Sequence, residues 1–214
     1  MAFKHTVVAA LALFVAVCGV ISSARADTFR IVGLGDSLMA GFSLGPGEGF
    51  TDKLQAALKA KGHDVTVANA GVSGDTSSGG LSRLDWSVPD GTRLVILELG
   101  ANDMLRGISP DITEKNLDAM LAKLKARNIP VLLAGMRAAP NLGADYQKAF
   151  DAIYPKLAAQ YGVPLYPFFL DGVAGHTDLQ IEDGMHPNPR GVDVMVEGIL
   201  PTVEKAIVAN GGAS

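Results

Sequence analysis

An aspartate and a histidine stand three residues apart near the end of the chain, in the segment Asp183-Gly184-Met185-His186-Pro187. Because Gly184 allows a tight turn, Asp183 can accept a hydrogen bond from one ring nitrogen of His186. This bond would fix the tautomer of the imidazole and leave its second nitrogen available as a general base. The alternative is an aspartate that caps the following helix beside an incidental histidine.

A serine that such a base could activate lies in Gly35-Asp36-Ser37-Leu38, directly after a short apolar run. Gly35 allows a sharp turn there, so Ser37 is expected where the chain leaves a strand. A neutral imidazole that removes the proton of this hydroxyl would make it a nucleophile. Serine is also a favoured helix N-cap, so Ser37 could instead cap the next helix.

Two more turns carry hydrogen-bond donors that could point at a ligand. Gly74 lies in Ser73-Gly74-Asp75-Thr76, where glycine permits a backbone path that exposes an N–H group. Asn102 lies in Gly100-Ala101-Asn102-Asp103, and its amide can donate two hydrogen bonds. Either segment could instead be a plain loop, with Asn102 forming an Asx turn.

Two other histidines in residues 27–214 are weaker candidates for a base. His63 lies in a polar turn before a predicted strand, at the end of the sheet away from the other candidates, and is expected to be a solvated surface residue. His176 lies in a glycine-flanked loop. Since no group of histidines, cysteines and carboxylates has the spacing of a metal site, we expect no metal.

Five short runs of apolar and β-branched residues are predicted to be strands. They are 29–34, 65–68, 94–99, 130–134 and 163–166. Their nearly continuous apolarity indicates burial on both faces, as in a parallel sheet covered by helices. In such a sheet, ligands bind beyond the carboxyl ends of the strands, where Ser37, Gly74 and Asn102 follow the first three.

Between and after these runs, apolar residues recur at helical spacing. The predicted helices include residues 50–58, 117–124, 150–157 and 192–203. Pro201 predicts a kink or a break near the middle of the last one.

The first 26 residues have the pattern of a secretory signal peptide. An unbroken apolar run of 15 residues from Val7 to Ile21 follows Lys4 and precedes Ala24-Arg25-Ala26. Because this run is shorter than the roughly 18 residues of a membrane span, we predict cleavage near Ala26 and no stable membrane anchor. The mature protein, residues 27–214, is then one periplasmic or secreted domain.

Composition excludes further classes of function. The formal net charge of −4 becomes −6 for residues 27–214, because Lys4 and Arg25 precede the cleavage site and no acidic residue does. An acidic domain with few aromatic residues is not expected to bind nucleic acid. The sole cysteine, Cys18, lies in the apolar run, so the nucleophile of the mature domain must be a hydroxyl rather than a thiolate.

Taken together, the segments around Ser37, Gly74, Asn102 and His186 resemble, in order, the four sequence blocks of the SGNH (GDSL) hydrolase family. The likeness runs over nearly the whole of residues 27–214 and is greatest to periplasmic multifunctional esterases described as thioesterase, arylesterase and lysophospholipase. The resemblance implies a flavodoxin-like three-layer α/β/α fold with a parallel sheet of about five strands.

The resemblance also implies a role for each residue. Ser37 would be the nucleophile, His186 the general base and acid, and Asp183 the residue that orients it. The backbone N–H groups of Ser37 and Gly74 and the side-chain amide of Asn102 would form the oxyanion hole. The positions that shape the acyl pocket in similar esterases are occupied here by Met104, Arg137, Ala138 and Ala139.

The implied function is the hydrolysis of carboxylic esters, and of acyl thioesters or lysophospholipids, through an acyl-enzyme on Ser37, with no cofactor. One alternative is a carbohydrate O-deacetylase that uses the same catalytic residues. Another is a flavodoxin-like binding domain without catalysis, although Leu38 stands where a dinucleotide-binding pattern beginning at Gly33 would need its third glycine. An α/β-hydrolase is disfavoured because neither 35–39 nor 71–75 completes G-x-S-x-G.

Overall fold

The computed structural model describes residues 28–212. The predictions made for residues 1–26, including the signal peptide and its cleavage near Ala26, lie outside the described residues.

Within residues 28–212, five parallel strands form one sheet in the order β2-β1-β3-β4-β5. The strands are β1 (Phe29–Gly35), β2 (Val65–Gly71), β3 (Leu94–Glu98), β4 (Val131–Ala134) and β5 (Leu165–Tyr166). Each overlaps a predicted strand, and the order is the flavodoxin-like one, so the predicted fold class is confirmed.

The strand order determines where a ligand can enter. β1 pairs with β2 on one side, with Phe29 opposite Val65, and with β3 on the other, with Ile31 opposite Leu94. The chain therefore leaves β1 for β2 and returns across β1 to form β3. The connections that follow β1 and β3 diverge, and this divergence creates the crevice where doubly wound sheets bind ligands.

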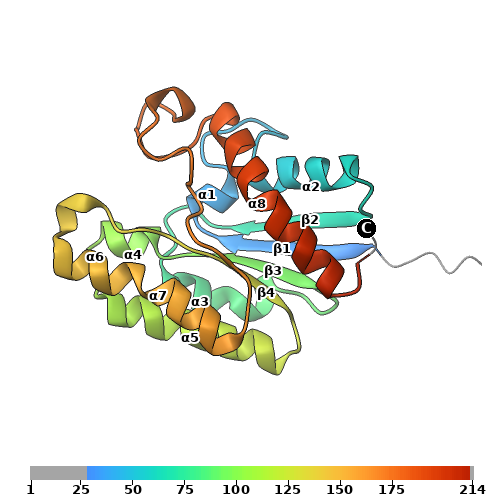
Figure 1. Ribbon diagram of the computed structural model, residues 1–214, viewed down its shortest axis with the longest axis horizontal. Helices are drawn as coiled ribbons and strands as arrows, with labels where there is room; N and C mark the ends of the chain where they lie inside the picture. Colours follow the sequence, from blue (N-terminus) through green and yellow to red (C-terminus); the bar gives the residue numbers. More distant parts are fainter. Residues whose placement is uncertain (1–27, 213–214) are drawn as a thin grey trace, which may run out of the picture.

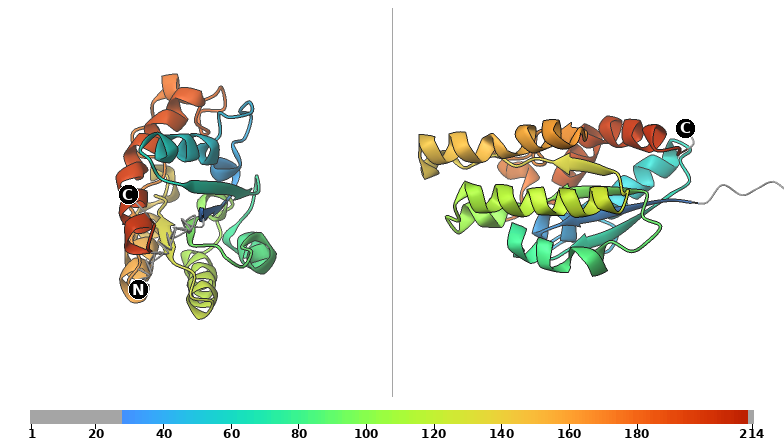
Figure 2. Two further views of the ribbon diagram at one scale, coloured as in Figure 1. Left: turned by 90° about the vertical axis from the view of Figure 1, so that its right-hand side faces the viewer. Right: turned by 90° about the horizontal axis from the view of Figure 1, so that it is seen from below.

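Helices cover both faces of the sheet (Figures 1 and 2). Helices α2 and α8 pack together on one face, and α3 packs with α5 on the other. The α-helices are α1 (Ser37–Ala40), α2 (Phe50–Ala60), α3 (Ser77–Ser87), α4 (Ala101–Leu105), α5 (Pro110–Ala126), α6 (Ala144–Asp151), α7 (Ile153–Tyr161) and α8 (Pro189–Ala209); η1 (Pro140–Leu142) and η2 (Thr177–Leu179) are short 3₁₀ segments. No helix of the described chain is both long enough and apolar enough to span a membrane.

Two helix predictions differ from the structure. The stretch predicted as one helix over 150–157 is divided between α6 and α7 at Ala152. Pro155 explains the division, because its ring cannot be accommodated in a helix that continues from the preceding turn. In contrast, α8 continues through Pro201, so the break predicted there does not occur. Burial of the apolar face of α8 compensates for the hydrogen bond that the proline removes.

Two burial predictions are also corrected. β1, β3 and β4 are almost wholly buried, but β2 is an edge strand and exposes Thr66, Ala68 and Asn69. His63, expected to be solvated, is 5% exposed, and its Nε2 lies 3.3 Å from Glu204 Oε1 of α8. The histidine does precede β2, at the amino end of the sheet as predicted, but it is buried and contacts Glu204 of α8, a helix that packs on α2.

Candidate active site

Ser37 lies immediately beyond β1, at the first position of the short helix α1. Asp36 is the N-cap of this helix, because its Oδ1 accepts a hydrogen bond from the backbone N–H of Leu38 at 3.0 Å. The alternative in which Ser37 caps the helix is therefore wrong. With the capping position occupied by Asp36, the hydroxyl of Ser37 is available to other partners.

The structure brings together Ser37, His186 and Asp183 although the serine is 149 residues before the histidine. Nε2 of His186 lies 2.8 Å from Oγ of Ser37, and Nδ1 lies 2.6 Å from Oδ2 of Asp183. Both ring nitrogens are thus engaged, one by the carboxylate and one by the hydroxyl. This is the geometry in which imidazole can take a proton from serine while the carboxylate orients the ring.

The loop between β5 and α8 holds Asp183 and His186 in place. Gly184 has a left-handed backbone with φ of 66°, which allows the tight turn that the sequence predicts. Oδ1 of Asp183 accepts hydrogen bonds from the backbone N–H groups of Met185 and His186, at 2.9 and 3.0 Å. Burial by itself would raise the pKa of Asp183, but these bonds and the contact with the His186 ring lower the pKa below its usual value.

An aromatic side chain that the sequence analysis did not single out packs on the histidine. The Phe42 ring lies 4.7 Å from the His186 ring, centroid to centroid, at an angle of 40°. Phe42 follows α1 and is 43% exposed, so it lies at the rim of the site. Its contact with the imidazole restricts the orientations that the His186 ring can adopt.

Asn102 lies at the second position of α4, the helix that follows β3. Its Nδ2 donates a hydrogen bond to Oδ2 of Asp36 at 3.0 Å, so the amide is oriented by the residue before Ser37. An amide carries two N–H donors, and the second remains for another acceptor. Asn102 therefore does more than form a local Asx turn.

Gly74 lies next to the segment that carries Asn102. Its φ of 83° is in the left-handed region, which glycine adopts without the penalty that other residues incur. Nη2 of Arg106, the C-cap residue of α4, donates to the Gly74 carbonyl at 2.6 Å. The segments carrying Gly74 and Asn102 are thus joined directly, at the carboxyl ends of β2 and β3.

Two carboxyl groups missed by the sequence analysis are buried beneath these segments, with Asp36 1% and Glu98 0% exposed. Oε2 of Glu98 accepts a hydrogen bond from the backbone N–H of Asp36 at 3.2 Å, while its Oε1 has no partner. Burial raises the pKa of Asp36 to about 6, against the lowering effect of the hydrogen bonds from Leu38 and Asn102. Burial and the neighbouring Asp36 raise the pKa of Glu98 well above its usual value. Glu98 is the one charged residue in an otherwise apolar predicted strand, and this position could have indicated a buried carboxyl group with a special role.

These raised pKa values predict how stability changes with pH. Between about pH 4 and 6 the folded protein keeps carboxyl protons that the unfolded chain has released, so these groups lower the free energy of unfolding as pH rises. Glu98→Gln removes one of these carboxyl groups and keeps an oxygen that can accept a hydrogen bond from the backbone N–H of Asp36. We expect the free energy of unfolding of this variant, relative to that of the parent protein, to increase as the pH rises.

Urea unfolding at several pH values between about 4.5 and 7.5 would measure this difference. Glu197→Gln, a substitution of an exposed glutamate on α8, is the control and should give a difference independent of pH. If the difference in the free energy of unfolding between Glu98→Gln and the parent protein were also independent of pH, Glu98 would have an ordinary pKa.

The four residues predicted to shape an acyl pocket are only partly brought together. Met104 and Ala138 are buried, and the backbone N–H of Ala139 lies 3.1 Å from Sδ of Met104. The guanidinium of Arg137 lies 5.2 Å above the Phe168 ring. These residues follow β3 and β4 at the same edge of the sheet as Ser37, and their contribution to acyl binding stays a prediction.

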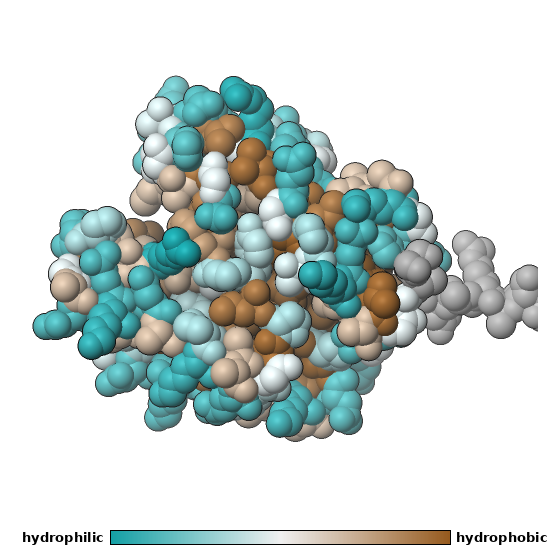
Figure 3. Space-filling model, viewed as in Figure 1, coloured by the Kyte–Doolittle hydropathy of each residue, from teal (hydrophilic) through white to brown (hydrophobic). Residues whose placement is uncertain are grey.

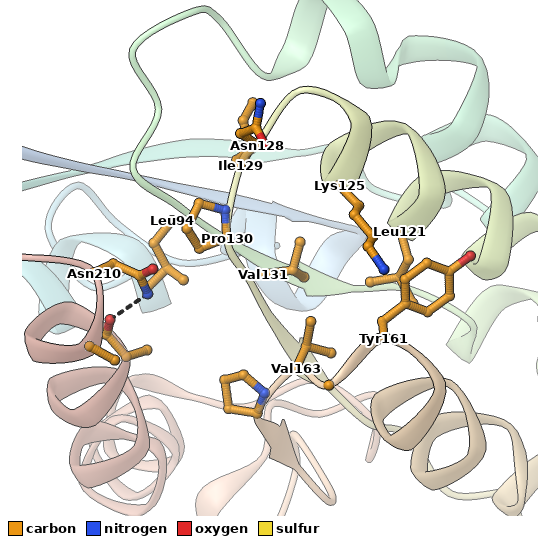
Figure 4. Close-up of a pocket in the computed structure, with 14 residues that line it drawn as sticks. Leu94, Leu121, Lys125, Asn128, Ile129, Pro130, Val131, Tyr161, Val163 and Asn210 are labelled. Atoms are coloured by element: carbon orange, nitrogen blue, oxygen red, sulfur yellow. Dashed lines mark hydrogen bonds between the residues drawn. The ribbon is translucent and has the colours of Figure 1, made fainter.

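The space-filling view shows a notch on the carboxyl side of the sheet, between the loop after β5 and the region of α6 (Figure 3). A separate hollow of about 480 Å³ lies at the amino ends of the strands, lined by residues such as Leu94, Val131 and Val163 (Figure 4). It contains none of the candidate site residues and no pair of nucleophile and base.

Within residues 28–212, no three histidine, cysteine or carboxylate side chains are grouped to hold a metal ion.

Comparison with known proteins gives a consistent result. Residues 34–194 match the GDSL-like Lipase/Acylhydrolase family. Esterase TesA of Pseudomonas aeruginosa is 40% identical over 182 residues, 85% of this chain and 90% of the relative. Thioesterase 1/protease 1/lysophospholipase L1 of Escherichia coli K12 is 41% identical over 186 residues, 85% of this chain and 87% of the relative.

A solved structure extends the likeness to three dimensions. The crystal structure of AlinE4, an SGNH-hydrolase family esterase, has 47% sequence identity and a TM-score of 0.72, and the alignment covers 85% of this chain and 97% of that one. With the family match over residues 34–194, these relatives show that the chain is a hydrolase and belongs to the GDSL-like lipase/acylhydrolase family, the SGNH hydrolases.

Proposed function

We propose that the protein is a serine esterase that cleaves carboxylic esters through an acyl-enzyme on Ser37. The observation that carries the proposal is the continuous hydrogen-bonded arrangement in which His186 contacts both Ser37 Oγ, at 2.8 Å, and Asp183 Oδ2, at 2.6 Å. The amide of Asn102 and the backbone of Gly74 lie on neighbouring segments beyond the same strand ends.

In the proposed mechanism, neutral His186 accepts the proton of Ser37 while the hydroxyl oxygen bonds to the acyl carbonyl carbon. The carbonyl oxygen becomes an oxyanion, which accepts hydrogen bonds from the N–H groups of Ser37 and Gly74 and from the second N–H of Asn102. Protonated His186 then gives its proton to the leaving alcohol or thiol as that bond breaks. Water, deprotonated by His186, attacks the acyl-enzyme and releases the acid and free Ser37.

The substrate class follows from the relatives and from the predicted pocket. One relative is named a thioesterase and lysophospholipase and another an esterase, so we propose small acyl esters, acyl thioesters and lysophospholipids as substrates. Apolar residues beyond β3 and β4, such as the buried Met104 and the half-buried Ala139, would contact the acyl chain. Initial rates on aryl esters, acyl thioesters, a lysophospholipid and acetylated sugars would separate this function from carbohydrate O-deacetylation.

The test of catalysis is covalent labelling by a fluorophosphonate. We expect one label per chain, attached to Ser37, with loss of esterase activity in the same proportion. A chain that remains unlabelled and inactive on every substrate class would favour the alternative of a binding domain without catalysis.

Replacing Asn102 by alanine tests the oxyanion hole. Loss of one oxyanion donor lowers kcat by about 10²–10³, so we expect Asn102→Ala to be severely impaired but measurable, with KM changed little. Asn210→Ala is a matched control, since it removes an amide that bonds Ala206 at the end of α8. If Asn102→Ala kept the parent value of kcat, the amide would have no part in stabilising the oxyanion.

We also propose that residues 1–26 are a signal peptide and that residues 27–214 are exported to the periplasm or beyond. The apolar run after Lys4 and the segment ending at Ala26 support this proposal. Mass spectrometry of the protein isolated from its host should find Asp27 at the amino terminus, and an intact amino terminus would contradict it.

A further inference from the structure

Helix α3 carries a buried arginine, Arg83, whose side chain joins two strands of the site. Arg83 is 5% exposed. Its Nη2 donates to the carbonyl of Gly35, at the end of β1, at 2.8 Å, and its Nη1 donates to the carbonyl of Ala70, near the end of β2, at 2.7 Å. β1 leads into the turn of Ser37, and β2 leads into the loop of Gly74. One guanidinium therefore fixes the distance between the starting points of these two segments.

The same guanidinium contacts the Gly74 loop itself. Nε of Arg83 donates to Oδ2 of Asp75, the residue after Gly74, at 2.5 Å, and Nη1 also donates to Oγ of Ser87 at 3.1 Å. The side chains of the ion pair are only 6% and 17% exposed, so water screens the attraction little. A guanidinium presents its donors in a rigid plane, and an ammonium group cannot satisfy the same acceptors at the same angles.

The amino end of α3 is fixed to the segment that carries Asn102. The backbone N–H of Ser77 donates to Oδ2 of Asp103 at 2.7 Å, and the Ser77 hydroxyl contacts Oδ1 of Asp103 at 2.5 Å. Asp103 follows Asn102 directly and is fully buried. Helix α3 is thus held at one end by the segment of one proposed oxyanion donor, and through Arg83 it contacts the segments of the other two.

We propose that Arg83 is a positioning residue for catalysis, which holds the Ser37 turn and the Gly74 loop at the separation in which their N–H groups converge on the oxyanion. The inference rests on the proposed function, because it concerns the donors of that site. Arg83 is buried behind the loop and acts through Gly35, Ala70 and Asp75 rather than by touching substrate. Oxyanion donors act more strongly in the transition state than on the bound ester, so their displacement lowers kcat and leaves KM nearly unchanged.

The test compares Arg83→Met and Arg83→Lys with the parent enzyme. Fluorophosphonate titration gives the concentration of competent sites, and kcat is expressed per titrated site. Inhibition by phenylboronic acid, which forms a tetrahedral adduct with a catalytic serine, measures the oxyanion hole independently of turnover. We expect kcat per site and boronic acid affinity both to fall by about 10- to 100-fold in Arg83→Met, and less in Arg83→Lys, with KM within about threefold.

Arg93→Met is the matched control. Arg93 also donates to a backbone carbonyl, that of Asn210 at 2.6 Å, and its guanidinium lies over the Phe29 ring at the amino end of the sheet. We expect its loss to lower the melting temperature without changing kcat per site or boronic acid affinity.

The outcomes separate the inference from the function on which it rests. If the parent protein is not labelled by the fluorophosphonate, the proposed function fails. If the parent is labelled and both Arg83 variants keep its kcat per site and boronic acid affinity, Arg83 serves only stability and the inference is overturned. If Arg83→Met does not fold, the same two measurements on Arg83→Lys decide between these results.

Discussion

Ser37→Ala is expected to lower kcat on a p-nitrophenyl ester by about 10⁶-fold, the size of loss seen when a serine hydrolase loses its nucleophile. The hydroxyl that His186 contacts at 2.8 Å is then absent, and no other group of the site can form the acyl-enzyme. What remains is the hydrolysis by water that the donors of the oxyanion hole still assist. Initial rates at high enzyme concentration would measure the remaining activity, and fluorophosphonate labelling should disappear.

The fold should survive this substitution. Ser37 does not cap α1, since Asp36 holds that position, so Ser37→Ala removes only the hydroxyl contact with the histidine. Far-ultraviolet circular dichroism and the melting temperature should remain close to the parent values. Ser109→Ala, at the exposed N-cap of α5 where no side-chain bond is made, is the control and should retain full activity. A Ser37→Ala protein with parent rates would eliminate Ser37 as the nucleophile.

Asp183→Asn is expected to lower kcat by about 10⁴-fold. The amide oxygen can still accept the two backbone N–H groups that now bond Oδ1, so the loop should keep its shape. Its NH₂ group, however, would face Nδ1 of His186 where the carboxylate Oδ2 stands at 2.6 Å. The ring would then take the tautomer with its proton on Nε2, which cannot accept a proton from Ser37.

Glu182→Gln provides a control with the same change in charge one residue away, at an exposed side chain. It should leave kcat and KM close to their parent values. The loss of activity in Asp183→Asn is expected to come from the wrong tautomer of His186 and not from the loss of one negative charge in the loop. Equal activity in the two variants would mean that Asp183 does not set the tautomer of His186.

Local sequence patterns were enough to predict the strands and most of the site. β1 and β3 are apolar over nearly their whole length because both of their faces are covered, and such runs are readable without knowledge of their neighbours. The turn around Gly184 was also predictable, because the contact between Asp183 and His186 spans only three residues. Each of these features is decided by side chains that are close in sequence.

Helix α3 shows where local patterns fail. Its apolar residues are few, and Gly79 and Gly80 lower its intrinsic helix propensity. The structure stabilises it through tertiary contacts instead, with a cap from Thr76, the bond from Ser77 to Asp103 and the buried guanidinium of Arg83. The residue that we propose to position the oxyanion donors therefore lies on a helix that the sequence did not predict.

The sequence by itself predicted an α/β fold with a parallel sheet, the family resemblance and the candidate catalytic side chains, because these depend on residue type, order and short spacings. The tertiary structure decided which of them meet. The 2.8 Å contact between Ser37 and His186 exists because β1 is an interior strand of the sheet and the loop before α8 returns to its carboxyl end. The burial of Asp36 and Glu98, and the placement of Arg83 behind Gly35 and Asp75, likewise depend on strands and helices distant in sequence. Long-range packing depends on many weak contacts between residues that are distant in sequence, and these contacts cannot be inferred from a local sequence pattern.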